Sequence, residues 1–485
     1  MNFNSGAFLI FLPTVVLLYW LLPFKFRWVW LLAASYFFYM YWDPKLIVLL
    51  LLTTGVSYGS AVLMTKFPKY RKPLLVLTLV VCLGVLFWFK YANFLMQSVL
   101  TVVNKLAAKD YSLTIDVILP IGISFYTFQT LSYVIDVYRG DFPAETHPGY
   151  YALFVVYFPQ LVAGPIENPR NLLPQLKTEQ HLNREDFEAG LRFLISGFFR
   201  KCVVADCCGI FVNNVFDQID TAGAPAILGA GALFCFQMYN DFAGYSEIAS
   251  GSARLMGIRL MQNFNRPYLS QTYAEFFRRW HISLNQWFTQ YLYIPLGGSR
   301  KGTARKIFNT IVVFSLCGLW HGANWTYLLW GLYAAFWVCF ETVVKKPSEA
   351  FAEKYQIDLK NSGVILFRRL VMFLIFIPAA LLFRAVSVSQ TGLIFSRLFT
   401  AWNSEALTGF FTQMGLTAPS FLFLILILLI MNELPEWQSR TFKLGFRFEE
   451  LSDVIQSVFL ILAIALCWLY LLSTEDAAAF AYFQF

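Results

Sequence analysis

Long apolar runs recur along this chain and constrain its fold more than any other feature. Residues 45–64 and 364–383, for example, each offer about twenty predominantly apolar residues, which is the length that a helix needs to cross a bilayer. The strands of a membrane barrel would alternate in hydrophobicity instead. Hydrophobic residues make up 58% of the sequence and charged residues 14%, against roughly 25% charged residues in soluble domains. The sequence therefore predicts an all-α polytopic membrane protein.

The apolar runs follow one another over the whole chain, so the sequence predicts one transmembrane domain over residues 1–485. We expect about 11–13 membrane elements in it. No internal repeat or low-complexity tract is evident in the sequence. The first run has no basic segment before it and a second run follows at once, which indicates a first membrane span and not a cleaved signal peptide.

The distribution of charge bears on partners and orientation. The net charge of +8 is spread over the loops without a block of like charge, so no nucleic-acid partner is expected. Two basic turns, at residues 25–27 and 66–72, agree in phase with the apolar runs. Because cytoplasmic loops carry an excess of Lys and Arg, these turns place the N-terminus outside the cytoplasm, in a multi-pass protein of the cytoplasmic membrane.

Several apolar segments are interrupted. Residues 74–99 form either one tilted span or a helix that ends at Lys90, with the lysine reaching an interface. Residues 117–137 carry a proline and a glycine that kink a span. Residues 150–162 are too short to span, and the three prolines of residues 158–169 break any helix. We expect a re-entrant element there, with an ordinary surface loop as the alternative.

The remaining elements follow from hydropathy. The predicted apolar elements are residues 7–22, 28–41, 193–216, 224–256, 325–340, 421–431 and 454–472. The polar or interfacial segments are residues 171–192, an amphipathic segment; 341–362, a surface loop with one short helix; and 393–402, a short re-entrant or interfacial piece.

Two polar side chains lie inside predicted spans and are candidate site residues. Asp241 belongs to the apolar segment 224–256, and Gln129 to the segment 117–137. An unpaired carboxylate in a bilayer is very costly, so Asp241 should face the protein interior or water. Both side chains either hold helices together by hydrogen bonds or line a cavity that a substrate enters.

The stretch 264–325 contains two of the four histidines of the chain, each directly after a tryptophan. His321 follows Trp320 between two long apolar runs, where an ionisable side chain is a functional-site hypothesis by default. The alternative is a histidine that forms a hydrogen bond between helices. His281 lies in a more polar segment that suits a half-buried helix.

A metal centre is not expected. His281 and His321 are far apart in the sequence and lack the spacing of a zinc-binding pair. The eight cysteines show no CxxC pair and no Cys/His ligand spacing, so neither a zinc site nor a disulfide framework is predicted.

Three motifs carry a resemblance to a known family. They are FFRRWHISL at residues 276–284, YLYIPLGGSR at 291–300 and LWHGANW at 319–325. In their sequence and order they resemble the membrane-bound O-acyltransferase (MBOAT) family, and most closely its bacterial branch that serves alginate O-acetylation and teichoic-acid D-alanylation. The resemblance extends from the first predicted helix to about residue 340. It implies a helical bundle with re-entrant pieces around a central tunnel, in a bacterial cytoplasmic membrane.

The resemblance also implies an activity and its partners. The protein would take an acyl group from a cytoplasmic thioester donor, which is acetyl-coenzyme A or an acyl carrier; acetyl is the expected group, and a longer acyl group is the alternative. It would pass the group to a hydroxyl of an extracytoplasmic glycan, directly or through a secreted partner O-acyltransferase. Membrane lipid would surround it, and no bound cofactor is implied.

The same resemblance assigns roles to residues. His321 matches the histidine regarded as catalytic in the family, where it acts as a general base, and His281 matches a second polar site residue. Arg278 and Arg279 belong to a basic collar that either meets donor phosphates or only marks topology. The other candidate substrate contacts from this stretch are Asn324, Trp320, Trp325 and Asn285.

Two rival functions remain open on the sequence. Broken helices and intramembrane carboxylates are also features of transporters, so a transporter or flippase for a lipid-linked sugar is one alternative. A member of the same family with a lipid or peptide acceptor is the other. Consumption of a thioester without any gradient would separate an acyltransferase from a transporter.

Overall fold

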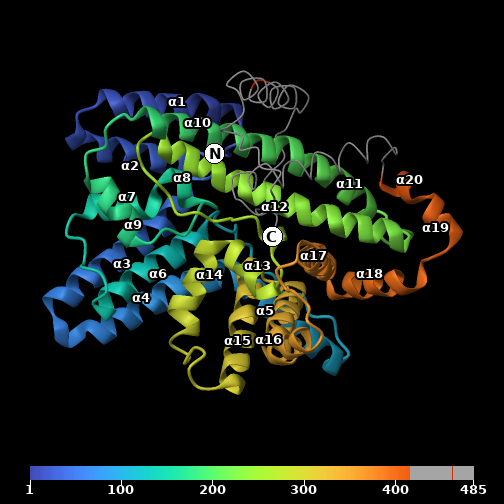
Figure 1. Ribbon diagram of the computed structural model, residues 1–485. Helices are drawn as coiled ribbons and strands as arrows, with labels where there is room; N and C mark the ends of the chain where they lie inside the picture. The colour runs from blue at the N-terminus through green and yellow to red at the C-terminus, as the bar shows by residue number, and fades with distance from the viewer. Residues whose placement is uncertain (415–460, 462–485) are drawn as a thin grey trace. The chain divides into compact units, whose positions relative to one another are not determined.

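The computed structural model describes residues 1–414 and Ile461, and all regular secondary structure in these residues is helical (Figure 1). The chain divides into two compact units that each combine separate stretches of sequence. The first unit consists of Met1–Leu194, Tyr245–Gln262 and Thr289–Tyr291, and the second of Ile195–Gly244, Asn263–Phe288 and Leu292–Phe485. The single transmembrane domain stays a prediction.

The first unit is built on helices from the N-terminal part of the chain. Helices α3, α4 and α6 pack against one another, and α2 packs against α7. The α-helices are α1 (Gly6–Leu21), α2 (Phe24–Met40), α3 (Ile47–Lys66), α4 (Arg71–Leu86), α5 (Ala92–Ala107), α6 (Ile123–Arg139), α7 (Pro148–Val156), α8 (Phe158–Leu161), α9 (Pro169–Lys177) and α10 (Arg184–Phe198), the last of which continues into the second unit. Short 3₁₀ turns, Pro44–Leu46 and Pro68–Tyr70, precede α3 and α4.

The structure decides between the two predictions for residues 74–99. Helices α4 and α5 are joined by a π-helical turn, Phe87–Tyr91, so the chain is helical without a break from Pro68 to Ala107. The Lys90 ammonium donates a hydrogen bond to the Ser124 hydroxyl at 3.3 Å. The helix therefore does not end at Lys90.

The proline-rich segment 158–169 is buried, so the surface-loop alternative is wrong. Helix α7 ends at Val156, and the four residues of α8 follow with Pro159 in their first turn, where the N–H that a proline lacks would have no partner within the helix anyway. Glu167, which is fully buried, accepts hydrogen bonds from the Met261 N–H and, at 2.7 Å, from the Asn171 amide. These bonds meet the polar atoms of a carboxylate that has no access to water. Re-entry into the bilayer stays a prediction.

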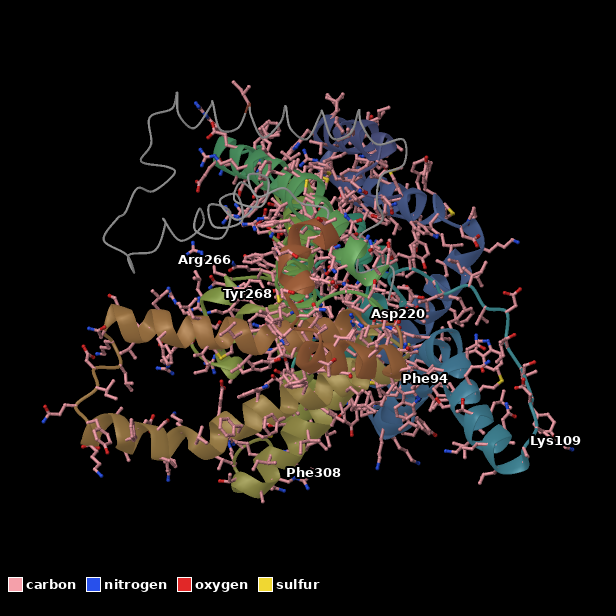
Figure 2. All side chains as sticks on the ribbon, turned by 90° about the vertical axis from the view of Figure 1, so that its right-hand side faces the viewer. Phe94, Lys109, Asp220, Arg266, Tyr268 and Phe308 are labelled. Atoms are coloured by element: carbon pink, nitrogen blue, oxygen red, sulfur yellow. The ribbon has the colours of Figure 1, made fainter. Side chains whose placement is uncertain are left out.

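The second unit contains the longest helices. Helices α15 and α16 pack against each other (Figure 1), and α16 also packs against α17 (Figure 2). The elements are a π-helical segment, η4 (Phe199–Ala205), then α11 (Asp206–Phe216), α12 (Ala224–Arg254, which continues into the first unit), α13 (Tyr273–Arg279), α14 (Ile282–Phe288), α15 (Thr303–His321), α16 (Trp325–Lys354), α17 (Ser362–Arg384), α18 (Val388–Thr400), α19 (Ser404–Thr408) and α20 (Phe410–Met414). The short turn Pro267–Leu269 precedes α13, and the π-helical segment Thr289–Tyr293, whose first three residues belong to the first unit, follows α14.

The predicted surface loop at residues 341–362 is wrong for residues 341–354, because α16 continues to Lys354. The carboxylate of Glu341 accepts hydrogen bonds from the N–H groups of Tyr273 and Ala274 at the start of α13. These bonds satisfy amides at the N-terminus of α13 that have no partner within their own helix, while Glu341 remains part of α16. The charge of Glu341 had suggested that a helix ends there, but its hydrogen bonds to α13 allow α16 to continue.

Other boundaries also differ from the predictions. Residues 117–122 are not helical, and α6 begins only at Ile123, after Gly122 in a left-handed conformation. The amphipathic segment 171–192 contains most of α9 and the first half of α10. The predicted piece at 393–402 lies mostly within the longer helix α18. The predicted elements 421–431 and 454–472 lie outside the described residues.

The all-α polytopic membrane class is confirmed. Within the described residues, four helices are long and apolar enough to cross a membrane: Pro44–Lys66, Pro68–Ala107, Trp325–Lys354 and Ser362–Arg384. Helix α1 is apolar but shorter. The total of 11–13 membrane elements stays a prediction.

The packing of α15 against α16 depends on two glycines. A methyl group at Gly318 would lie closer than 3.0 Å to the Tyr327 carbonyl oxygen, and one at Gly331 equally close to the Phe314 carbonyl oxygen. Small residues at a helix crossing allow two backbones to approach closely in a membrane protein. A side chain at either position would push the two helices apart.

We therefore expect Gly331→Ala to lower the melting temperature of the detergent-solubilised protein, with a cost of about 1–3 kcal/mol from overpacking. Gly59→Ala in α3 is the matched control, since a methyl group there would meet no atom within 4 Å. Thermal unfolding of both variants checks the expectation. Equal melting temperatures for Gly331→Ala and the wild type would show that the helix pair tolerates separation.

Candidate active site

His321 is the last residue of α15 and is 7% exposed. The chain leaves the helix at Gly322, and α16 begins at Trp325, where the Asn324 side-chain oxygen accepts a hydrogen bond from the Thr326 N–H at 3.1 Å. The motif that surrounds His321 in the sequence is thus a tight connection between two packed helices. This connection holds the imidazole at a helix end.

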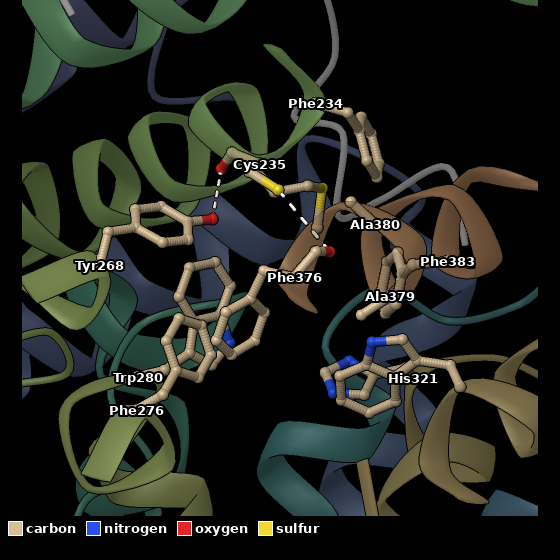
Figure 3. Close-up of a pocket in the computed structure, with 12 residues that line it drawn as sticks. Phe234, Cys235, Tyr268, Phe276, Trp280, His321, Phe376, Ala379, Ala380 and Phe383 are labelled. Carbon is tan, nitrogen blue, oxygen red and sulfur yellow. Dashed lines mark hydrogen bonds between the residues drawn. The ribbon is translucent and has the colours of Figure 1, made fainter. Parts of the chain in front are cut away.

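A cavity of about 60 Å³ lies beside the imidazole of His321. Figure 3 shows His321 next to Phe383 and Ala379, with Phe276 and Trp280 across the open space. The Tyr268 hydroxyl donates a hydrogen bond to the Cys235 carbonyl at 2.7 Å, so this polar group is satisfied by the protein (Figure 3). The lining residues are Phe234, Cys235, Met238, Tyr268, Phe276, Trp280, His321, Trp330, Phe376, Ala379, Ala380 and Phe383.

Aromatic rings surround His321. The ring centroids of Trp330, Phe383 and Trp320 lie 5.2, 5.4 and 5.2 Å from that of His321, all in edge-to-face orientation. The Cys317 sulfur, one turn earlier on α15, lies 4.0 Å from His321 Nε2. These rings exclude water from most of the imidazole and restrict its rotation.

His281 lies in the turn between α13 and α14 and is 1% exposed. Its ring packs edge-on against Phe242 at 4.7 Å and Trp320 at 5.8 Å. Trp320 therefore contacts both histidines. Burial lowers the pKa of His281 well below its ordinary value of 6.5, and repulsion from His321 lowers it further. The neutral imidazole is the form that this position favours.

The turn that carries His281 has an unusual backbone. His281 has φ of +44°, a left-handed conformation that non-glycine residues adopt rarely. The Asn285 amide stabilises it by donating to the carbonyl oxygens of Trp280 at 2.6 Å and His281 at 3.1 Å. Asn285, a candidate substrate contact, thus acts on the turn itself. Left-handed residues that neighbouring groups hold in place occur often at functional sites.

Asn263 also holds this turn and was not among the residues that the sequence predicted for the site. Its carbonyl oxygen accepts from the Ile282 N–H at 2.9 Å, and its side-chain oxygen accepts from the Ser283 hydroxyl at 2.7 Å. Asn263 is 2% exposed. The only signal in the sequence was a polar residue at a helix-breaking junction before the motif 276–284.

A cluster of charged and polar side chains connects η4 with α12. The Lys201 ammonium lies 2.8 Å from a carboxylate oxygen of Asp206 and 2.8 Å from one of Asp241, and its side chain is 1% exposed. The neighbouring Arg200 donates to the Asn240 side-chain oxygen at 3.0 Å. Asp241 therefore faces the protein interior, as expected, and is ion-paired there. The sequence did not predict this role of Lys201, because its partner Asp241 lies 40 residues away.

These cations fix the part of α12 that contacts the histidine turn. Tyr239 packs against Phe264 at 5.9 Å and Trp280 at 6.2 Å, while Phe242 packs against His281. The residues held by Arg200 and Lys201 lie between these two rings in the sequence. We define Arg200, Lys201, Asn240 and Asp241 as the η4–α12 clamp. It holds one aromatic wall of the site.

Several of the other candidate site residues do not line the cavity beside His321. Trp325 is 48% exposed, and neither it nor Asn324 lines the cavity. The Asn324 amide donates to the Val386 carbonyl oxygen at 2.9 Å. Gln129 belongs to the first unit, where its amide donates to the Phe154 carbonyl oxygen at 2.6 Å. Substrate contacts by these three residues stay predictions.

The two arginines at the end of α13 differ. Arg278 is exposed, whereas the guanidinium of Arg279 forms an ion pair with Glu275 at 2.8 Å, one turn earlier on the helix. Only Arg278 is thus exposed enough to meet a phosphate from solvent without losing a partner. Within the described residues, no group of three or more His, Cys, Asp or Glu side chains is placed to hold a metal ion.

Comparison with known proteins identifies related chains. Residues 142–383 match the MBOAT, membrane-bound O-acyltransferase, family. A probable alginate O-acetylase of Azotobacter vinelandii is 37% identical over 82% of this chain and 78% of its own. A peptidoglycan O-acetyltransferase of Helicobacter pylori is 34% identical over 68% of each chain. A teichoic acid D-alanyltransferase of Bacillus subtilis is 27% identical over 44% of this chain and 57% of its own.

The η4–α12 clamp yields a prediction for stability. Lys201→Met leaves two carboxylates without their buried cation, and removing one partner of a buried ion pair costs about 3–5 kcal/mol. We expect the double variant Lys201→Met/Asp241→Asn to melt at a higher temperature than Lys201→Met alone, because it also removes one uncompensated charge. Thermal unfolding of the wild type, the two single variants and the double variant measures this coupling. Additive effects would contradict it.

The lowered pKa of His281 predicts a dependence of stability on pH. Below pH 6.5 the unfolded chain binds a proton at this histidine that the folded chain does not, so stability is fully present above 6.5 and falls as the pH decreases. We expect the melting temperature of the wild type to decrease as the pH is lowered below 6.5. His281→Gln should lose less, and His181→Gln, at an exposed histidine, should behave like the wild type. The hypothesis fails if all three proteins show the same decrease.

Proposed function

Because this chain belongs to the membrane-bound O-acyltransferase family, we propose that it transfers an acetyl group from a thioester donor to a hydroxyl group of an extracytoplasmic polysaccharide. The family makes the protein an acyltransferase. The observation that carries the finer proposal is the position of His321, a buried histidine beside a small apolar cavity. Such a cavity can hold an acyl group away from water.

The chemistry assigned to His321 is that of a general base. Its neutral imidazole takes the proton from the acceptor hydroxyl while that oxygen attacks the acyl carbon of the thioester. The carbon–sulfur bond then breaks, and the imidazolium gives the proton to the departing thiolate. The products are an ester and a thiol, and no proton is gained or lost overall. The aromatic rings around His321 favour this transfer over hydrolysis because they limit the access of water.

His281 assists in this proposal without taking the proton. It contacts Trp320, which also contacts His321, so its turn fixes one side of the catalytic imidazole. We call His281 a positioning residue for this reason. The η4–α12 clamp supports the same wall through Phe242. The exposed Arg278 is the candidate for a contact with donor phosphates.

The partners follow from the relatives. Their names specify alginate, peptidoglycan and teichoic acid, so a glycan of the cell envelope is the proposed acceptor. The proposed donor is acetyl-coenzyme A or an acyl carrier on the cytoplasmic side, and a secreted O-acyltransferase is a proposed intermediary. The bacterial relatives and the basic turns at residues 25–27 and 66–72 support a cytoplasmic membrane location with an extracytoplasmic N-terminus.

We expect His321→Ala to abolish O-acetylation of envelope glycan in cells, since no other described group on the cavity can act as a base. The loss should be at least about a hundredfold, the usual contribution of general-base catalysis. Ester-linked acetate is measured at matched membrane levels of the two proteins. His181→Ala, at an exposed histidine, is the control and should retain acetylation. Full acetylation with His321→Ala would exclude His321 as the base.

A further inference from the structure

The volume of the cavity beside His321 limits what it can hold. A dry engineered cavity of about 150 Å³ binds benzene, which corresponds to about 25 Å³ for each heavy atom. The cavity here measures about 60 Å³, which leaves room for about two or three heavy atoms. An acetyl group has three heavy atoms, a propionyl group four, and a butyryl or alanyl group five. The acetyl group is therefore the largest of these that fits without displacing side chains.

We propose that Phe376, supported by Phe276, is the specificity-determining residue that limits the transferred group to two carbons. This inference rests on the proposed function, because it takes the cavity to be the acyl pocket of that reaction. It adds what the family membership leaves open, namely which residues of this chain set the length of the acyl group.

Phe376 packs against two neighbouring aromatic rings. Its ring stacks on Tyr273 with a centroid distance of 4.6 Å and an interplanar angle of 7°, and lies 3.8 Å from the ring of Phe276. Phe276 in turn stacks on Trp280 at 5.3 Å. Because each ring packs against the next, a rotation of Phe376 that admits a longer chain would have to displace Tyr273 and Phe276. Interiors packed this closely do not accept an added methylene without distortion.

The lining also discriminates by charge. Among the described residues that line the cavity, none carries a charge apart from a protonated form of His321. The hydroxyl of Tyr268 and the sulfur of Cys235 are directed to the carbonyl oxygens of Cys235 and Phe376, at 2.7 and 3.9 Å (Figure 3). An aminoacyl group such as alanyl would bring an ammonium into this apolar space without a partner. The chemistry of the lining therefore favours acetyl over alanyl as well.

The test compares how efficiently each protein uses acyl donors of different length. Purified wild type, Phe376→Leu and Phe373→Leu are each given acetyl-, propionyl- and butyryl-coenzyme A in competition, and the ratios of kcat/KM for transfer to envelope glycan are measured. Phe373 is the matched control: it lies on the same helix α17, one turn earlier, and packs against Phe236 and Tyr268 without lining the cavity. The change of side chain is the same in both variants.

We expect the wild type to prefer acetyl over propionyl by at least about tenfold, the lower limit of what one methylene contributes in an apolar pocket. Phe376→Leu should reduce that ratio about tenfold or more, and Phe373→Leu should leave it unchanged. An unchanged ratio in a folded, acetyl-transferring Phe376→Leu protein would overturn the inference. If the wild type transfers no acyl group at all, the proposed function has failed instead.

A second variant tests the inference even if Phe376→Leu does not fold. Met238 lines the same cavity from α12, and Met238→Ala enlarges it without touching the aromatic stack. We expect it to widen the donor range in the same direction. If Phe376→Leu does not fold and Met238→Ala keeps the wild-type ratio, the cavity does not set the acyl length and the inference is rejected.

Discussion

In an apolar helical bundle, a polar side chain persists only where the protein itself supplies its hydrogen bonds and counter-charges. The second unit satisfies this requirement around its two histidines. The cation of Lys201 lies between two carboxylates, the carboxylate of Glu341 receives the first amides of α13, and the turn at His281 is held by two asparagines. Several of these bonds join segments that are separate in the sequence, as Lys201 with Asp241 and Glu341 with the start of α13. The placement of the histidines depends on all of them.

As a consequence of this arrangement, the proposed general base, His321, is largely shielded from water. Aromatic rings from α12, α13, α16 and α17 meet around the connection between α15 and α16, and they leave only a small cavity. A general base is useful there because the acyl thioester would be lost to water in an open site. The polar network keeps its charges away from this cavity, and His321 carries the only imidazole among the described residues on its wall.

The sequence predicted the parts of the structure that depend on local pattern. Apolar runs gave α12 and α17 nearly to their observed bounds, and the rarity of histidine in apolar surroundings directed attention to His321. It did not predict Lys201 or Asn263, because their roles arise from contacts with distant residues. It was wrong about Glu341 for the same reason: the partner that allows a carboxylate to continue the helix is a helix N-terminus about 70 residues earlier.

The measurement that decides between an acyltransferase centred on His321 and any transport function is the release of thiol from acetyl-coenzyme A by the purified protein. A detergent solution has no gradient across a membrane, so a transporter would release no thiol from acetyl-coenzyme A. With envelope polysaccharide present, we expect thiol and polysaccharide-bound acetate to appear in equal amounts, and neither to appear with His321→Gln. Thiol release that is absent from the wild type, or undiminished in the variant, would contradict this assignment.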